Sequence, residues 1–283
     1  MHYRELGETG AKVSEVGLGC NRLGQAYASE GHWVGLVRRA ADLGVTLYDT
    51  SETYGWGDSE RILGKALGNR DDVLIATKMG RIRETDEHDF SAERMMETVE
   101  DSLRRLRRDV IDIYQLHSPT REALENDSWP AGMTKLKEQG KIRFAAVAVR
   151  SEEDAIWLME QGWVEVLQIT YNILHTKPEK KLFDVARKTG VGLMARRPLA
   201  RGVLTGKFRP DEEVGEGHRA LLDGDSMYKN IRRAEELRPI AERYDGGMTR
   251  MALHFSLTPQ AVSSVIPGAR TIEQIGRASC RER

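Results

Sequence analysis

The chain has 283 residues, of which 40% are apolar, enough to build a sizeable hydrophobic core. Its 43 basic and 44 acidic side chains leave a formal net charge of -1, so charge gives no reason to expect a nucleic acid or an anionic membrane as partner. There are only two cysteines, no Cys/His spacing indicates a metal site, no apolar run approaches the ~20 residues that span a bilayer, and the amino terminus lacks a signal-peptide core. We therefore expect a cytoplasmic protein.

Short apolar runs alternate along the chain with longer amphipathic runs. Several of the short runs are apolar almost throughout, which is typical of parallel strands buried on both faces. Eight runs are predicted strands: residues 15–19, 45–50, 72–78, 111–117, 142–149, 164–170, 191–196 and 261–267.

Amphipathic segments with the terminal signals of helices lie between these strands. The predicted helices occupy residues 31–44, 59–68, 91–107, 151–162 and 178–190. Ser59 and Ser91 stand at the N-cap positions of two of them, and Gly44 can end the first. A basic cluster, RRLRR at residues 104–108, comes late in the third helix and is expected to face water.

Eight strand–helix alternations without a long linker predict an α/β fold, a single (β/α)8 TIM barrel. The alternative is a doubly wound open sheet, which usually carries G-x-G-x-x-G after its first strand when it binds a dinucleotide. Here Gly19 is followed by Gly24, with no glycine at residue 22, so that fingerprint is absent. We expect one domain over residues 1–275.

Two segments depart from the alternation. Residues 199–228 are a long, Gly- and charge-rich connection after the seventh strand, and such a connection in a compact domain is usually functional. We expect it to be a lid over a bound ligand, with a floppy insertion as the alternative. Residues 276–283, GRASCRER, break the amphipathic period and resemble a translated sequencing adapter, so we expect a foreign tail on a truncated barrel with a shortened last helix.

Polar side chains stand at the predicted carboxyl ends of successive strands. Asp49 ends the second strand and Tyr54 follows in the next loop, while Lys78 ends the third strand and His117 the fourth. Each of them alone fits an ordinary surface or packing role. Because a barrel brings the carboxyl ends of its strands to one mouth, we expect the four to converge there.

The chemistry of this set points to carbonyl reduction. An ammonium group favours the phenolate form of a neighbouring phenol and so lowers its pKa. With Asp49 holding Lys78 charged, Tyr54 is predicted to donate a proton to a carbonyl oxygen that His117 orients. None of these side chains supplies the pair of electrons that reduces the carbonyl carbon. Without a metal, the reaction therefore needs a hydride donor, and a nicotinamide cofactor is implied.

Six motifs, in order from residue 3 to about 275, resemble the aldo-keto reductase family: LYDTSETYGWGDSERILGKAL, LIATK, DIYQLH, KIR, PLARGVLTGKF and SVIPGARTIEQI. The resemblance implies a barrel reductase that uses NADPH/NADP+ and acts on a small-molecule carbonyl or sugar. The catalytic tetrad of the family corresponds to Asp49, Tyr54, Lys78 and His117.

The resemblance also implies cofactor contacts. Gln168 corresponds to the glutamine that holds the nicotinamide amide, PLARG to the loop around the pyrophosphate, and IPGAR to the segment around the adenosine 2′-phosphate, where an arginine favours NADPH over NADH by charge. The candidate cofactor residues are Asp49, Gln168, Arg196, Pro198, Leu199, Gly202, Gly268, Arg270 and Gln274.

Two places depart from the family pattern near the nicotinamide. Ala148 and Val149 stand where the family usually has a Ser and an Asn that hold the carboxamide, so two hydrogen bonds of around 1 kcal/mol each are lost. Arg196 and Arg197 replace an aromatic or small polar residue, and a guanidinium there can stack on a ring, meet a phosphate or bind an anionic substrate. The candidate substrate contacts are Asn21, Arg22, Trp56 and Arg150.

The leading hypothesis is reduction of an aldehyde, ketone or sugar carbonyl, or the reverse oxidation, with Tyr54 as general acid or base. The same Tyr/Lys/His group could abstract a proton in a lyase or an isomerase instead, and the altered carboxamide site leaves room for that. A third hypothesis is a nucleotide-sensing binding protein, against which the intact tetrad argues.

Overall fold

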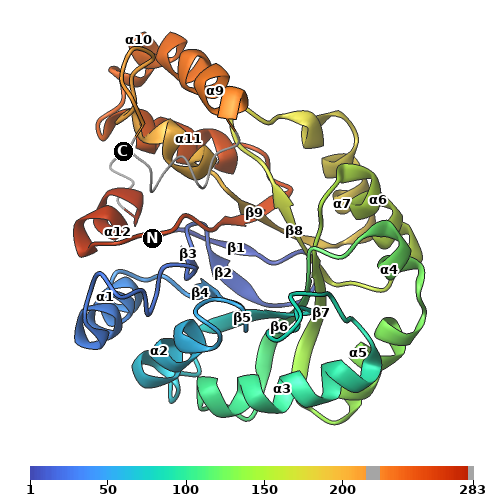
Figure 1. Cartoon of the computed structure of the whole chain (residues 1–283). Coiled ribbons are helices and arrows are strands. Elements are labelled where there is room, and N and C mark those ends of the chain that lie inside the picture. Colours follow the sequence, from blue (N-terminus) through green and yellow to red (C-terminus); the bar gives the residue numbers. More distant parts are fainter. Residues whose placement is uncertain (215–223, 280–283) are drawn as a thin grey trace.

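A parallel sheet of eight strands forms the centre of the fold. The computed structural model describes residues 1–214 and 224–279, and Figure 1 shows the sheet ringed by helices. The strands are β3 (Leu18–Gly19), β4 (Leu47–Asp49), β5 (Leu74–Met79), β6 (Ile111–His117), β7 (Ile142–Ala148), β8 (Val166–Thr170), β9 (Gly192–Arg196) and β10 (Val262–Val265). They pair in chain order, and every pair is parallel.

Parallel bridges from Val16 to Val265 and from Gly19 to Gly268 join the first strand to the last. Gly19 is needed at this closure, because a Cβ atom on it would lie 2.9 Å from the carbonyl oxygen of Ile266. The predicted (β/α)8 barrel is therefore confirmed, and each of the eight predicted strands has its counterpart.

Helices cover the outside of the barrel. All five predicted helices are present, as α1 (Glu30–Asp42), α2 (Asp58–Leu67), α3 (Ala92–Leu106), α6 (Glu152–Gln161), and η1 (Lys177–Lys180) followed by α7 (Leu182–Thr189). The helices without a predicted counterpart are α4 (Arg121–Glu125), α5 (Ser128–Glu138), α9 (Gly224–Glu236), α10 (Arg238–Ala241) and α11 (Gly247–Leu257). The helix α12 (Ile272–Ser279) stands where a shortened last helix was expected.

One predicted helix cap is confirmed and another is wrong. Ser91 accepts a hydrogen bond from the backbone N–H of Arg94 at the start of α3. Ser59 does not cap α2, because this helix begins one residue earlier, after Gly57 in a left-handed conformation. The Ser59 hydroxyl is buried instead and donates to the carbonyl oxygen of Cys20 at 2.8 Å.

A small apolar layer fills the barrel interior, and an amino-terminal hairpin forms its floor. The hairpin consists of β1 (Tyr3–Glu5) and β2 (Lys12–Ser14), which pair antiparallel. Leu6 and Val13 of the hairpin are fully buried against the first inward side chains of the barrel strands. The layer consists of Leu6, Ala11, Val13, Leu47, Leu74, Ala76, Ile113, Ala146, Val166, Met194 and Ile266. This hairpin was not predicted, since strands of three residues are too short to show a period.

The segment after β9 is more ordered than its composition predicted. Of residues 199–228, expected to be one long loop, Ala200–Thr205 form the 3₁₀ helix η2 and α9 begins at Gly224, while residues 215–223 lie outside the described residues. Side chains from η2, α9, α10 and α11 build a second, smaller core, which includes Leu204, Ile231 and Met251.

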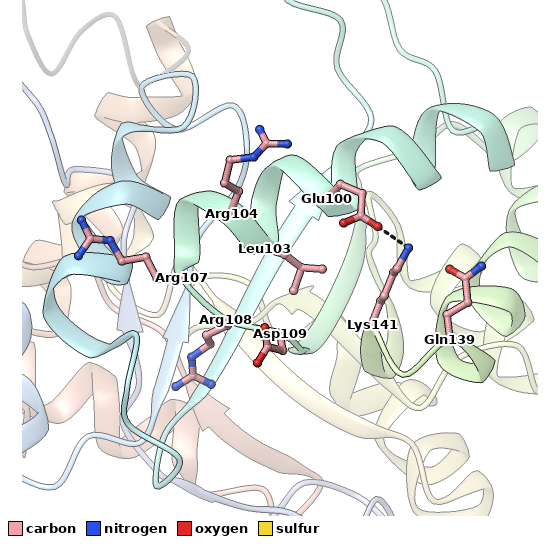
Figure 2. Close-up of a pocket in the computed structure, with 8 residues that line it drawn as sticks. All are labelled: Glu100, Leu103, Arg104, Arg107, Arg108, Asp109, Gln139 and Lys141. Atoms are coloured by element: carbon pink, nitrogen blue, oxygen red, sulfur yellow. Dashed lines mark ion pairs between the residues drawn. The ribbon is translucent and has the colours of Figure 1, made fainter.

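The basic cluster at residues 104–108 only partly faces water, so that prediction is corrected. Arg104 is exposed, but Arg105 pairs with the buried Glu60 at 2.6 Å and Arg108 pairs with Asp112 at 3.1 Å. The end of α3 and the turn before β7 line a pocket of about 560 Å³. Figure 2 shows the residues that line it, among which Lys141 pairs with Glu100. This pocket lies at the amino ends of β6 and β7, the end of the barrel opposite the candidate residues.

The boundary predicted at residue 275 falls inside α12, which continues to Ser279, and residues 280–283 lie outside the described residues. Within residues 1–214 and 224–279, no helix is long and apolar enough to cross a membrane. In the same ranges no group of three or more His, Cys, Asp or Glu side chains is placed to hold a metal ion.

Candidate active site

The candidate site is the upper layer of the barrel interior. Side chains alternate between the two faces of a strand, so a residue two positions beyond an inward apolar one also points inward. Asp49 follows Leu47 in this way, and Lys78 follows Ala76. His117, Gln168 and Arg196 occupy equivalent positions near the carboxyl ends of β6, β8 and β9. The barrel thus brings the predicted polar residues to one mouth.

Lys78 is the centre of this layer. Its side chain is fully buried, and Nζ lies 2.7 Å from a carboxylate oxygen of Asp49 and 2.7 Å from the carbonyl oxygen of Thr50. The hydroxyl of Tyr54 is 3.5 Å from the same Nζ, which stands 5.0 Å from the centre of the Tyr54 ring. Three oxygen atoms therefore surround the three protons of one buried ammonium group.

Asp49 is held from the other side by two amides. The Nε2 atoms of Gln168 and Gln115 donate to its Oδ1 at 2.7 Å and 3.1 Å. Gln115 was not among the predicted site residues, although it stands two positions before His117 on the same face of β6. These hydrogen bonds fix the carboxylate that positions Lys78.

His117 lies beside Tyr54. The two rings meet edge to face, with centroids 5.9 Å apart and planes at 83°. Ser51, in the loop that also carries Tyr54, places its hydroxyl 3.0 Å from Nδ1 of His117. Ser51 was missed as well, although it stands between Asp49 and Tyr54 in the motif LYDTSETYGWGDSERILGKAL.

The pKa values in this cluster correct one expectation. Burial raises the pKa of Tyr54, and the positive charge of Lys78 offsets only part of that effect. The predicted lowering of the Tyr54 pKa is therefore wrong, because the phenol is desolvated as well as close to a cation. For Lys78, burial acts to lower the pKa, but Asp49 and then Tyr54 outweigh it and the pKa is raised. At neutral pH the phenol is protonated and the ammonium group charged.

His117 is neutral in this environment. Burial, followed by the positive charges of Lys78 and Arg196, lowers its pKa to about 3. A neutral imidazole has one N–H donor and one acceptor nitrogen, so His117 can orient an oxygen atom without adding a second positive charge to the site.

A second cluster gathers around the loop after β10. Asn21 Oδ1 approaches Gly268, and Arg270 donates its backbone N–H to Gln274 Oε1 at 2.7 Å. Burial and then the charge of Arg270 lower the pKa of Arg22, and the pKa of Lys207 falls for the same two reasons, with Arg22 adding a smaller effect. Arg22, Lys207 and Arg270 therefore form a cation cluster from three segments that are distant in the sequence. Asn21 and Arg22, which were predicted as substrate contacts, lie in this cluster beside the cofactor candidates Gly268 and Arg270. Lys207 was not predicted, although the motif TGKF contains it.

The η2 segment lies beside this cation cluster. Pro198 is buried, and Leu199 packs against the core of η2, α9, α10 and α11 and also against the large core between the barrel strands and the outer helices. Gly202 has φ 101°, a conformation that favours glycine, and a Cβ atom there would stand 3.7 Å from Lys207 Nζ. The backbone thus turns sharply where the PLARG motif was predicted to wrap a phosphate.

The remaining candidates come from the end of β9 and from the loops after β4 and β7. Arg196 is half-buried and donates to the carbonyl oxygen of Val149 at 2.8 Å, and Arg150 is exposed. Arg197 is exposed as well, with its backbone in the left-handed region. Ala148 and Val149 offer no side-chain hydrogen bond at the position where the family usually has two. Trp56 also has a left-handed backbone conformation, and the centre of its ring lies 5.8 Å from the guanidinium carbon of Arg83.

Comparison with known proteins places this geometry in a family. The model of the aldo/keto reductase family matches residues 15–278. The L-galactose dehydrogenase of Arabidopsis thaliana is 33% identical over 97% of this chain and 86% of that protein. The NADH-specific methylglyoxal reductase of Escherichia coli is 29% identical over 95% of this chain and 90% of that protein. The holo form of an aldo-keto reductase from Bacillus halodurans superposes with a TM-score of 0.84, at 30% identity over 99% of this chain and 90% of that one.

A nicotinamide-dependent oxidoreductase built on a (β/α)8 barrel is the class that this fold and these relatives define. The chain belongs to the aldo/keto reductase family.

Proposed function

We propose that the protein is an NADPH-dependent carbonyl reductase, able to run in either direction, in which Tyr54 exchanges a proton with the substrate oxygen. The observation that carries this proposal is the position of Lys78 Nζ, within 2.7 Å of Asp49 and 3.5 Å of the Tyr54 hydroxyl. When bound, the nicotinamide supplies the hydride that no side chain of the site can provide.

Tyr54 acts as the general acid. Its phenol is protonated at neutral pH, and a carbonyl oxygen that gains negative charge accepts this proton in the transition state. Lys78 stabilises the phenolate that remains, because its ammonium group is charged and already next to the hydroxyl. Asp49 keeps that ammonium in place and compensates its charge.

Neutral His117 orients the carbonyl. Its ring stands at the edge of Tyr54, so a substrate oxygen within reach of the phenol is also within reach of an imidazole nitrogen. Ser51 bonds to the other ring nitrogen and holds the plane of the ring. Both roles are positional and neither requires His117 to take up a proton.

The residues present fit a phosphate-bearing dinucleotide. Arg22, Lys207 and Arg270 gather positive charge that a phosphate would neutralise, and Gly202 and Gly268 leave their backbones open to close approach. We assign the 2′-phosphate to this cluster and therefore propose NADPH over NADH. Gln168 keeps its Oε1 for the nicotinamide amide while its Nε2 is bound to Asp49.

A lyase or isomerase remains the second candidate, favoured by one observation: Ala148 and Val149 leave the carboxamide without its usual side-chain partners. A nucleotide-sensing binding protein is the third, and nothing in the upper layer favours it over the others.

Absorbance of the reduced nicotinamide separates these functions. The purified protein is mixed with NADPH and a panel of aldehydes, ketones and aldoses, and both cofactor and product are followed. A reductase consumes one NADPH for each alcohol formed. Product without consumption of cofactor would instead establish a lyase or isomerase, and binding without any product would establish a sensor.

A further inference from the structure

Among the residues that the structure describes, the guanidinium of Arg196 is held at the mouth by neutral oxygen atoms. Its Nε donates to Thr170 Oγ1 at 3.2 Å, Nη1 to Ser118 Oγ at 3.3 Å and Nη2 to the carbonyl oxygen of Val149 at 2.8 Å. These bonds use three of its five N–H groups, so two are left to face a ligand. A partly buried guanidinium normally has an anionic partner.

Arg150 reaches the same point from the loop after β7. Its Nε donates to the carbonyl oxygen of Ser118 at 2.5 Å. Two guanidiniums therefore bind one residue, Ser118, which follows His117 directly and has a left-handed backbone conformation (φ 58°). After burial, the charge of Arg201 and then that of Arg150 lower the pKa of Arg196, so these cations repel one another.

Nearby carboxylates compensate these two charges only in part, since Asp49 acts on Arg196 through its charge but is paired with Lys78. They are engaged elsewhere: Glu52 by the backbone N–H groups of Gly80 and Arg81, Asp86 by the Arg81 side chain, and Asp49 by Lys78. Over residues 1–214 and 224–279, the ion pairs of the structure include neither of the two arginines that meet at Ser118.

The site therefore has a cationic edge next to its acid. After burial, the charges of Lys78 and Arg196 lower the pKa of His117 most, and Arg81 adds a smaller effect. Like charges held this close are costly unless an anion joins them. The cofactor phosphates have their own cation cluster at Arg22, Lys207 and Arg270, whereas Arg196 lies close enough to Tyr54 and Asp49 to interact with them electrostatically.

We propose that Arg150 and Arg196 form a carboxylate subsite, and that the substrate is a carbonyl compound bearing a carboxylate, such as an oxo acid or an acidic sugar. The inference rests on the proposed function for the reaction at the carbonyl. The carboxylate is bound by the N–H groups of the two arginines and leaves the reaction unchanged, while the carbonyl oxygen lies between Tyr54 and His117. Binding of the carboxylate to the two arginines determines the orientation of the substrate, with its carbonyl end directed to Tyr54 and His117.

The first test compares matched substrates. 4-Oxobutanoate is paired with butanal, and 4-carboxybenzaldehyde with its methyl ester, at saturating NADPH and low ionic strength. We expect kcat/KM to favour the carboxylate of each pair by about 10- to 100-fold, mainly through KM, which is the value of one or two charge-assisted hydrogen bonds. Added salt should reduce this preference.

Variants locate the preference. Arg150→Gln and Arg196→Gln should each lower the carboxylate preference by about tenfold, and Arg196→Lys should restore part of it. Arg187→Gln, on the outer surface of α7, is the matched control and should leave the preference unchanged. Since Arg196→Gln removes a partly buried group, the exposed Arg150 provides the variant that tests the subsite without disturbing the barrel.

Benzoate provides a readout that does not need turnover. Its dissociation constant, from quenching of tryptophan fluorescence, should rise about tenfold in Arg150→Gln with cofactor bound. If neither member of a pair is reduced, the proposed function fails, and benzoate still decides on the subsite. Equal kcat/KM within each pair would overturn the subsite and leave the reductase standing. The subsite would also be overturned if the arginine variants lost affinity for NADPH but kept the same affinity for benzoate, since the arginines would then bind the cofactor.

Discussion

Lys78 shows at the scale of one residue how the site is tied to the stability of the barrel. An ammonium group with no exposed surface is costly unless its protons are bonded, and Asp49 and Thr50 accept two of them at 2.7 Å. Such a pair adds little when intact, but removing one partner leaves the other charge buried and alone. The reactive group and a vulnerable point of the core are therefore the same residue.

Lys78→Met is expected to lower the free energy of unfolding by about 3–5 kcal/mol, because Asp49 would remain buried without its cation. Urea denaturation followed by circular dichroism measures the change. Lys65→Met, which removes an exposed lysine that pairs with Glu30, is the control and should cost less than about 1 kcal/mol. Equal losses in the two variants would contradict the buried pair.

The pH dependence of reduction tests the protonation states of Tyr54 and His117. The pKa of His117 is about 3 and that of Tyr54 is raised above its usual value, so neither titrates near neutrality. We expect kcat/KM for reduction to show no inflection around the ordinary histidine pKa of about 6.5, and to fall only in the alkaline range where Tyr54 loses its proton. A break near neutrality that His117→Gln abolishes would show that the imidazole is charged during turnover.

His117 also links stability to pH. Its folded pKa lies below the unfolded value, so the unfolded chain binds the extra proton between the two. Its contribution to stability is present above the ordinary histidine pKa and is lost as the pH falls from there towards about 3. The decline in the free energy of unfolding over that window should be shallower in His117→Gln than in the parent protein.

At the scale of elements, the β1–β2 hairpin supports the layer on which the site rests. Leu6 is fully buried against the inward residues at the amino ends of the barrel strands, and Arg4 ties the hairpin to α11 and β10 through the carbonyl oxygens of Leu257 and Val262. The polar upper layer has to be built on a filled apolar layer, because a void below it would admit water to Lys78.

Leu6→Ala should lower the free energy of unfolding by about 2–5 kcal/mol, the usual cost of a cavity at a fully buried leucine. Lys12→Ala on the same hairpin removes an exposed ion pair with Glu5 and should change it by less than about 0.5 kcal/mol. Chemical denaturation of the two variants in parallel measures both changes in the free energy of unfolding. A Leu6→Ala variant as stable as Lys12→Ala would show that the hairpin is not part of the core.

The strands and the convergence of Asp49, Tyr54, Lys78 and His117 could be predicted because each depends on a local pattern. Apolar runs mark buried parallel strands, and polar residues at their ends mark the mouth. Ser51 and Ser118 were missed because their importance comes from contacts with residues on other elements, which no spacing reveals. The water-facing prediction for residues 104–108 failed for the same reason, since the carboxylate that Arg105 binds belongs to Glu60 on α2.

At the scale of the whole molecule, the cation cluster draws together segments from both ends of the chain. Arg22 comes from the loop after β3, Lys207 from the end of η2 and Arg270 from the loop after β10. Closing the barrel places the first and last of these segments side by side through the bridge from Gly19 to Gly268. Cofactor choice in the proposed function is thus a property of the closed barrel.

Arg270→Gln should raise the dissociation constant for NADPH by about 10- to 100-fold and change that for NADH little, because only NADPH carries the 2′-phosphate that we assign to this cluster. Fluorescence titration with each cofactor measures both constants, and Arg187→Gln on α7 is again the control. Equal weakening for the two cofactors would place the 2′-phosphate elsewhere.

The central claim is that a phenol held beside a buried ammonium group delivers the proton to the carbonyl. Its most direct test is Tyr54→Phe, assayed for both turnover and cofactor binding in the same preparation. We predict that kcat for carbonyl reduction falls by about 10²- to 10⁴-fold, while the dissociation constant for NADPH stays that of the parent protein. Unchanged turnover in Tyr54→Phe would contradict the account.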